Sequence, residues 1–213
     1  TKSQLVKSFA KNITLLSKMG IKVVVVHGGG PQIEKELRKR KIKDREFQGL
    51  RITTKKILAI VKSILARQLN KMILNEINKC GGNAKSINGI NTKIIKAKFM
   101  MGGKLGFVGE PTKLDKKYLN KLLAKGMVPI ISPIGYDNKN NSYNINADTA
   151  AGFIAESLKA QRLLLLTDVA GVLDKDRKLI VELNHKKAFK YIKKGTIKGG
   201  MIPKIKACFN TLR

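Results

Sequence analysis

The chain has 213 residues, of which 43% are hydrophobic, so it can supply a core, and wholesale disorder is excluded. Its 44 basic and 14 acidic residues give a net charge of +30. The lysines are spread along the chain without a basic block interleaved with aromatics, which indicates a solvated surface and not a nucleic-acid site. No apolar run is long enough to span a membrane, and Cys80 and Cys208 have no metal spacing and fit a reducing compartment; nothing demands a disulfide.

The beginning of the chain predicts a helix, a buried strand and a glycine loop. Apolar residues at helical spacing run up to Gly20, and the all-apolar run 23–26 reads as a strand of a parallel sheet. Three glycines, 28–30, follow directly, and Pro31 opens a charged helix to about residue 41. A strand, a glycine loop and a helix N-terminus favour a phosphate or carboxylate site. The alternative is a glycine-rich turn without a ligand.

The middle of the chain predicts one long helix between irregular and β segments. Residues 43–53 read as irregular, and an amphipathic helix with apolar residues from Ile57 to Ile77 follows. Short β segments with glycine turns are expected over 84–108, and a helix over 115–125.

The remainder alternates strand and helix patterns. We expect a strand at 127–132, a hairpin flanked by Ile134 and Tyr143, a helix over 147–158 and a third apolar strand at 162–167. A turn at 168–171, a helix over 184–194 and a last helix opened by 199–203 complete the chain. Strands alternating with helices predict an α/β fold with a mainly parallel sheet, whose ligands gather at the carboxyl ends of the strands. The best domain boundary divides the chain into 1–159 and 160–213.

Several motifs stand in a fixed order along the chain, without a Walker A motif or a dinucleotide fingerprint. They are VVHGGGPQI around the glycine loop, GLR at 49–51, Asn70-Lys71, LGFVGE at 105–110, YNINADTAAG at 143–152, LLTDVAGVL at 165–173 and GGMIPK at 199–204. This set resembles the amino-acid kinase family, and within it the members that phosphorylate N-acetyl-L-glutamate. The resemblance implies a three-layer αβα sandwich, ATP and Mg²⁺ as cofactors, and a substrate-binding part (1–159) followed by an ATP-binding part (160–213).

The resemblance also assigns roles to single residues. Gly29 and Gly30 would offer backbone N–H groups to the substrate carboxylate and the transferring phosphoryl group. Arg51 would hold the α-carboxylate, for which a bidentate guanidinium is suited. Asn144 would bind the acetylamino acid from the other side.

In the same way, Asp148 would organise the catalytic lysines and Lys204 would stabilise the transferred phosphoryl group. The implied nucleotide-binding residues are Asp168, Val169, Gly171, Lys198 and Gly199.

Each assignment has a plainer alternative. Arg51 could be a surface arginine, Asn144 a turn residue, Asp148 the N-cap of the next helix, and Asp168 a turn cap. Lys204 could be one of the many ordinary lysines of the chain, and only its place after Gly-Gly-Met-Ile-Pro singles it out. We expect His27 to pack under the glycine loop and not to touch a ligand.

The chain also departs from the family pattern. Family members begin with a strand and a lysine-bearing glycine loop and continue beyond the equivalent of Arg213, so we expect this chain to be a piece that lacks both and is inactive alone. Arg67-Gln68 stands where Gly-Lys is usual, and 86–91 replaces a loop near the substrate; both put substrate fine-tuning in doubt.

Two rival functions stay open: a kinase of another acylated amino acid such as an aminoadipate derivative, and a non-catalytic module binding arginine or a regulator. The scattered lysines argue against a third, a nucleic-acid-binding protein that uses the charge, which a steep salt-dependent affinity for DNA would revive. The resemblance implies a homo-oligomer, a dimer or hexamer, with possible arginine feedback and a nitrogen-signalling protein as partner. The expected compartment is the cytoplasm or the plastid stroma, and the expected route leads to arginine or ornithine.

Overall fold

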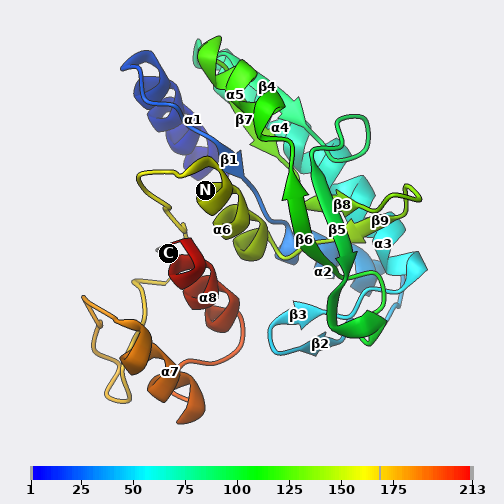
Figure 1. The fold of residues 1–213 in the computed structure, drawn as a ribbon, viewed down its shortest axis with the longest axis vertical. Coiled ribbons are helices and arrows are strands. Elements are labelled where there is room, and N and C mark those ends of the chain that lie inside the picture. The colour runs from blue at the N-terminus through cyan, green and yellow to red at the C-terminus, as the bar shows by residue number, and fades with distance from the viewer. Residues whose placement is uncertain (1, 168, 212–213) are drawn as a thin grey trace.

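The computed structural model describes residues 2–167 and 169–211, and a parallel sheet lies at its centre (Figure 1). The strand β7 (Val128–Ile131) is the middle strand, between β1 (Val25–Val26) and β4 (Ala84–Ile87). The two predicted apolar strands therefore exist and are parallel, with Val25 opposite Ile130. β1 is shorter than the valine run.

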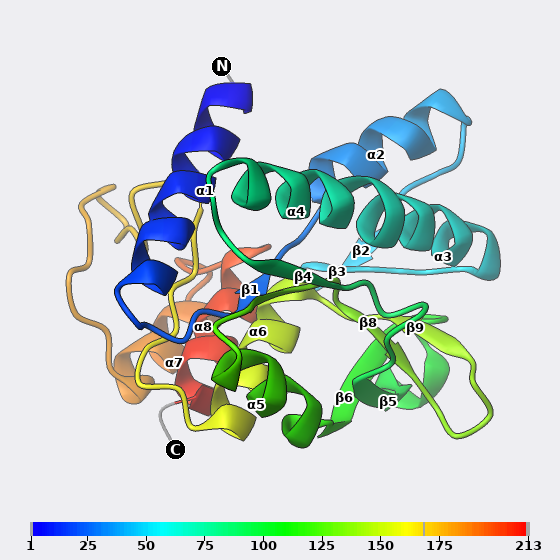
Figure 2. The same cartoon turned by 90° about the horizontal axis from the view of Figure 1, so that it is seen from above.

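Helices cover both faces of this sheet, which confirms the predicted α/β class (Figure 2). The helices α1 (Lys2–Lys18) and α4 (Asn70–Lys79) pack with Val128 and Ile130 on one face. The helices α5 (Lys116–Ala124) and α6 (Ala147–Leu158) pack with Ile131 on the other. Alternate residues of a strand point to opposite faces, so β7 must be apolar throughout to fill both layers.

A second sheet lies beside the first and has the order β6-β5-β8-β9. Its strands are β5 (Ile95–Phe99), β6 (Gly109–Leu114), β8 (Ile134–Tyr136) and β9 (Ser142–Asn144). β8 and β9 form the predicted hairpin. In its turn the Asp137 carboxylate accepts hydrogen bonds from the amides of Lys139 and Asn141 and from the Tyr143 hydroxyl. Burial and the bond to Asp137 raise the pKa of Tyr143 to about 12.

The long helix predicted in the middle of the chain is interrupted by a wide turn. It comprises α3 (Lys55–Lys62), a π-helix η1 (Ser63–Leu69) and α4, and α2 (Gly30–Lys39) packs beside α3. The Thr54 hydroxyl caps α3 by accepting from the Ile57 amide. A π-turn contains an extra residue, which changes the direction of every later side chain relative to the turn before it. Apolar spacing alone does not predict that change.

The region expected to be irregular contains a small hairpin instead. The strands β2 (Glu46–Phe47) and β3 (Leu50–Arg51) pair antiparallel around Gln48 and Gly49, which both have positive φ. A 3₁₀ segment, η2 (Met100–Gly103), links β5 to β6. The strands β2 and β3 are each two residues long, which is too short for an alternating pattern to be recognised in the sequence.

The third apolar strand, predicted at 162–167, is not present. In the described part of the chain these residues are assigned to no strand, and Leu164 and Leu166 are 73% and 72% exposed. A strand exists only where a neighbour satisfies its backbone N–H and C=O groups. The apolar run at 162–167 therefore does not by itself predict a strand, because apolar side chains supply no hydrogen-bonding neighbour.

The last two helices lie apart from the first sheet, the final one beside α6 and the other packed against that final helix (Figure 1). They are α7 (His185–Lys193), which lies within the helix predicted over 184–194 and is N-capped by Asn184, and α8 (Met201–Thr211). α8 packs on α6 through small residues, since a Cβ on Gly152 would lie 3.0 Å from the Ala207 Cβ. The division at residue 159 stays a prediction.

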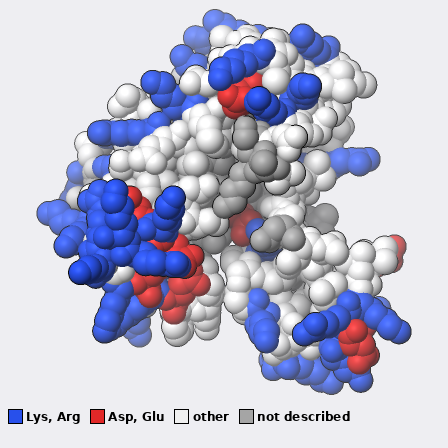
Figure 3. Space-filling model, turned by 180° about the vertical axis from the view of Figure 1, so that it is seen from behind, with Lys and Arg blue, Asp and Glu red and all other residues white. Residues whose placement is uncertain are grey.

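The basic surface is divided into separate groups. On the face in Figure 3, Lys and Arg side chains gather in several places with uncharged residues between them. Within the described ranges, no helix has both the length and the hydropathy needed to cross a membrane.

Replacing Ile130 with Ala tests the central packing. Ile130 is completely buried in β7, so removal of its side chain should lower the free energy of unfolding by about 2–5 kcal/mol. The control Ile21→Ala changes a side chain that is 49% exposed and should cost less than about 0.5 kcal/mol. Urea unfolding measures both, and equal losses in the two variants would contradict the described packing.

Candidate active site

The glycine loop follows β1 at the carboxyl edge of the sheet, where the sequence places it. A Cβ on Gly29 would lie 2.6 Å from Leu69 Cδ1 and 2.7 Å from Leu65 Cδ2, so a side chain here would force these two buried leucines to move. Gly29 is also the N-cap of α2, and its carbonyl accepts from the Ile33 amide. The first amides of a helix have no helical acceptors and carry partial positive charge. The loop therefore presents backbone donors suited to an anion.

The loop lies beside the start of α6. A Cβ on Gly28 would be 3.4 Å from the Ala147 Cβ. The N-cap of α6 is Asn146, whose Oδ1 accepts from the Thr149 amide at 3.0 Å. The alternative in which Asp148 is the N-cap is therefore wrong, and its carboxylate is available for another partner.

That partner is Lys204 on α8. The Lys204 Nζ lies 2.9 Å from Asp148 Oδ1 and 3.2 Å from Oδ2. The two side chains are 23% and 18% exposed, so the ion pair is largely shielded from solvent. This contact joins residues 56 positions apart. It singles out Lys204 among the many lysines of the chain.

Arg51, on β3, is held by a residue that the sequence did not indicate. Its Nε lies 2.8 Å from Asp44 Oδ1, and its Nη2 lies 2.8 Å from Oδ2. The Arg51 side chain is 12% exposed and is therefore not an ordinary surface arginine. A bidentate contact fixes the guanidinium plane and leaves further N–H groups for a second carboxylate. Asp44 lies in the region expected to be irregular, so no pattern marked it.

Thr53 connects Arg51 to Asn144. The Asn144 Nδ2 donates to Thr53 Oγ1 at 3.0 Å, and Thr53 Oγ1 donates to the Arg51 carbonyl at 2.8 Å. Thr53 is completely buried. Asn144 ends β9, so this contact places the two predicted substrate ligands on adjoining backbone segments. The role of Thr53 depends on a long-range contact and could not be predicted from local sequence.

The tip of the β2–β3 hairpin touches the loop before α8. A Cβ on Gly49 would lie 2.8 Å from the Gly199 carbonyl oxygen, and Gly49 has a φ of +77°. Lys198 is exposed in the same loop. The GLR motif and the GGMIPK motif are therefore neighbours in space.

The described contacts connect two of the predicted nucleotide residues to no other site residue, and a third cannot be placed. Asp168 lies outside the described residues. Val169 is 49% exposed, and the near neighbour of a Cβ on Gly171 would be Leu179. The described contacts thus bring Lys198 and Gly199 to the hairpin but do not bring Val169 or Gly171 to the glycine loop.

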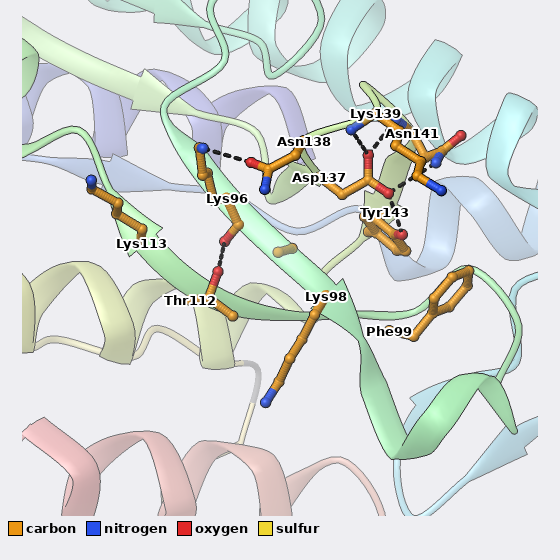
Figure 4. A pocket seen from close by; sticks show the side chains of 11 residues that line it. Lys96, Lys98, Phe99, Thr112, Lys113, Asp137, Asn138, Lys139, Asn141 and Tyr143 are labelled. Atoms are coloured by element: carbon orange, nitrogen blue, oxygen red, sulfur yellow. Dashed lines mark hydrogen bonds between the residues drawn. The ribbon is translucent and has the colours of Figure 1, made fainter.

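A separate hollow of about 600 Å³ lies over β5 and the β8–β9 turn (Figure 4). Lys96, Lys98 and Lys113 line it, and Asp137 faces it while bonded within its own turn. The Lys96 Nζ donates to Asn138 Oδ1 at 2.7 Å, and Lys98 pairs with Glu110 at 3.4 Å. It contains none of the predicted site residues.

Comparison with known proteins identifies the family. The amino acid kinase family model matches residues 1–213. The chain belongs to the amino acid kinase family. Curated relatives named acetylglutamate kinase include that of Rhodospirillum centenum, 44% identical over 218 residues, which cover 97% of this chain and 72% of that protein. The protein of the same name from Clostridium acetobutylicum is 41% identical, covering 97% of this chain and 73% of its own length.

Solved structures agree on the fold. The crystal structure of smu.665 from Streptococcus mutans has a TM-score of 0.89 at 28% identity and covers 95% of this chain and 82% of that one. N-acetylglutamate synthase from Neisseria gonorrhoeae, in complex with coenzyme A and N-acetyl-glutamate, has a TM-score of 0.82 at 21% identity. It covers 97% of this chain and 48% of that chain, and it supports the fold alone.

His27 provides a pH test of the region under the loop. Its side chain is buried, as expected, and burial lowers its pKa from the ordinary 6.5 against the opposing effect of the hydrogen bond with Gly28. The unfolded chain then binds a proton at higher pH than the folded protein does. Stability should therefore fall as pH decreases below about 6.5 towards the lower folded-state pKa.

Urea unfolding of the chain and of His27→Gln between pH 7 and pH 5 measures this effect. The variant should lose stability less steeply on acidification. His185→Gln, which changes an exposed histidine at the start of α7, is the matched control and should keep the original slope. A slope unchanged in His27→Gln would contradict the assignment.

Proposed function

We propose that this chain carries the site for ATP-dependent phosphorylation of the side-chain carboxylate of N-acetyl-L-glutamate. The product is N-acetyl-L-glutamyl phosphate, a step of arginine biosynthesis. One observation carries the proposal: the glycine loop, the Asp148–Lys204 pair and Arg51 belong to a connected set of contacts. The curated relatives of the chain, at 41–44% identity, have the name of that enzyme.

The reaction needs little covalent help from the protein. The substrate carboxylate is ionised at neutral pH, so no general base is required. Its oxygen forms a bond to the γ-phosphorus, while the bond to the bridging oxygen breaks and ADP leaves with that electron pair. Two anions must approach each other, so the work of the site is alignment and neutralisation of charge.

The glycine loop and Lys204 supply that neutralisation. We assign the Gly29 and Gly30 amides to the carboxylate and the transferring phosphoryl group, since the N-terminus of α2 favours negative charge. Lys204 adds a full positive charge. Asp148 keeps the ammonium group in place and is not a base, because both its oxygens already contact Lys204.

Arg51 and Asn144 hold the substrate. Asp44 fixes the guanidinium of Arg51, whose remaining N–H groups meet the α-carboxylate. Asn144 reaches the acetylamino group from the neighbouring segment. Since both are tied to Thr53, their spacing is set by buried contacts.

The triphosphate of ATP fits the donors of this site, which are backbone amides and lysines. We assign Lys198 and Gly199 to the nucleotide because they adjoin the hairpin; Val169, Gly171 and Asp168 are proposed from the family resemblance alone. The described residues contain no group of three His, Cys, Asp or Glu that could hold a metal ion. Phosphate oxygens would therefore hold the Mg²⁺, which neutralises phosphate charge when bound.

Assembly, regulation and compartment stay predictions from the family resemblance. They comprise a dimer or hexamer, arginine feedback, a nitrogen-signalling partner, and the cytoplasm or plastid stroma.

Trapping of the product tests the proposed function. Hydroxylamine converts an acyl phosphate into a hydroxamate and releases phosphate. Because the chain is expected to be inactive alone and covers 72–73% of the two curated relatives' length, this assay and the kinetic tests below use the full-length protein. With ATP, Mg²⁺, hydroxylamine and N-acetyl-L-glutamate, it should form hydroxamate and ADP in equal amounts. N-acetyl-L-aspartate, L-glutamate and N-acetyl-aminoadipate serve as rival substrates. Preference for the aminoadipate derivative would favour the rival kinase, and arginine binding without hydroxamate would favour a non-catalytic module.

Lys204→Ala tests the phosphoryl-stabilising role. Loss of one preorganised donor should lower kcat by about 10²–10³-fold. Lys206→Ala, on the same helix but exposed, is the matched control and should keep kcat within about twofold. Full activity in Lys204→Ala would refute the assignment.

A further inference from the structure

A buried polar cluster lies directly under the glycine loop. It consists of His27, Asn70 and Ser132, which are 7%, 0% and 1% exposed, with the half-buried Ser86 at its edge. They come from the ends of β1 and β7, from β4 and from the start of α4. None of these side chains has a role in the proposed reaction.

Asn70 is the centre of this cluster. Its Nδ2 lies 2.8 Å from the Ile130 carbonyl, 3.0 Å from Ser132 Oγ and 3.3 Å from His27 Nε2. Its Oδ1 accepts from Ser86 Oγ at 2.5 Å. One side chain therefore joins all three strands of the parallel sheet to the long helix.

These contacts fix the state of the His27 ring. His27 Nε2 lies 3.2 Å from Ser132 Oγ and 3.3 Å from Asn70 Nδ2, and in a neutral ring it is an acceptor when the proton is on Nδ1. The other nitrogen, Nδ1, lies 3.2 Å from the Gly28 carbonyl oxygen, which can only accept, so Nδ1 carries the proton. The neutral ring with its proton on Nδ1 thus connects Asn70 to the backbone of the glycine loop.

The π-helix η1 contacts the glycine loop next to this polar cluster. Leu65 and Leu69 enclose Gly29, and Asn70 follows Leu69 directly. The Leu65 carbonyl accepts from the Asn70 amide and from Ser132 Oγ at 3.2 Å. The wide turn allows Leu65 and Leu69 to face the loop while Asn70 faces the sheet.

We infer that Asn70 and His27 are positioning residues that set the orientation of the glycine-loop amides. The contact with Asn70 orients the His27 ring, and the ring holds the Gly28 carbonyl by a hydrogen bond. The Gly28 carbonyl and the Gly29 amide belong to the same peptide plane, so fixing one fixes the other. The consequence for catalysis rests on the proposed function; the effect on the loop does not.

A stability role alone would not require these residues. Buried polar groups lower stability unless every partner is satisfied, and an apolar cluster of the same shape is often as stable. Among the described residues no buried side-chain nitrogen or oxygen lacks a partner. Such a network specifies one geometry, which a set of leucines would not do.

The test compares Asn70→Leu with Asn75→Leu, a control on the exposed side of α4. Nitrogen NMR of the histidine rings reads the tautomer, and His185→Gln assigns the signals, since the chain has two histidines. Asn70→Leu should change the His27 nitrogen shifts and the amide shifts of 28–30. The control should leave both sets unchanged.

Kinetics on the folded fraction gives the second measurement. In Asn70→Leu, kcat per folded molecule should fall about 10- to 100-fold, because small misplacements of an aligned group are costly. The KM for ATP and the KM for N-acetyl-L-glutamate should each change less than about threefold. Ser132→Ala removes little volume and three contacts of Ser132 Oγ, with Asn70 Nδ2, His27 Nε2 and the Leu65 carbonyl. It should have a smaller effect in the same direction, and it decides between the outcomes if Asn70→Leu does not fold.

The inference is overturned if the His27 and loop shifts of the folded variants match those of Asn75→Leu. It is also overturned if the shifts change but kcat per folded molecule does not. If the unmodified protein forms no hydroxamate from N-acetyl-L-glutamate, the proposed function fails, while the NMR comparison still decides whether Asn70 orients the loop.

Discussion

The lack of space at Gly29 is the constraint on which the rest of the site depends. Leu65 and Leu69 occupy the space that a Cβ at this position would enter, so a side chain here would have to displace two buried leucines of the long helix. The amides that begin α2 are thereby directed to the carboxyl edge of the sheet. A rigid set of dipoles costs no reorganisation when charge develops, which is the main way in which a site for phosphoryl transfer lowers its barrier. Leu65 and Leu69 are therefore as much a part of the site as the glycines.

The charged groups reach this loop from distant parts of the chain. Lys204 arrives on α8, which packs on α6 through Gly152 and Ala207, and Asp148 at the start of α6 receives it. Arg51 arrives on a hairpin whose tip at Gly49 contacts the loop before α8. Small residues allow these close approaches, so the glycines and alanines of the motifs have steric reasons that are separate from ligand binding.

Much of this could be predicted from the sequence, and the failures have physical causes. The valine run, the glycine loop and the helical periods are local signals, and they located two strands of the parallel sheet and most helices. The run at 162–167 failed because apolarity does not supply a hydrogen-bonding neighbour. Asp44 and Thr53 were missed because their roles exist only through long-range contacts. The π-turn was missed because one extra residue in a helix leaves no mark in the apolar spacing. The motif set gave Lys204 and Asp148 their roles, and the ion pair between them is consistent with that interpretation.

Ligand-induced shifts of the glycine amides test most directly whether carboxylate and phosphate meet at this loop. Labelling with ¹⁵N-glycine gives signals for the 19 glycines of the chain. We predict that N-acetyl-L-glutamate and ADP together shift the Gly29 and Gly30 amides, while Gly20 and Gly126, which lie at the ends of α1 and α5, do not move. Saturable binding of both ligands without a change at Gly29 or Gly30 would contradict the assignment of the loop as the place of phosphoryl transfer.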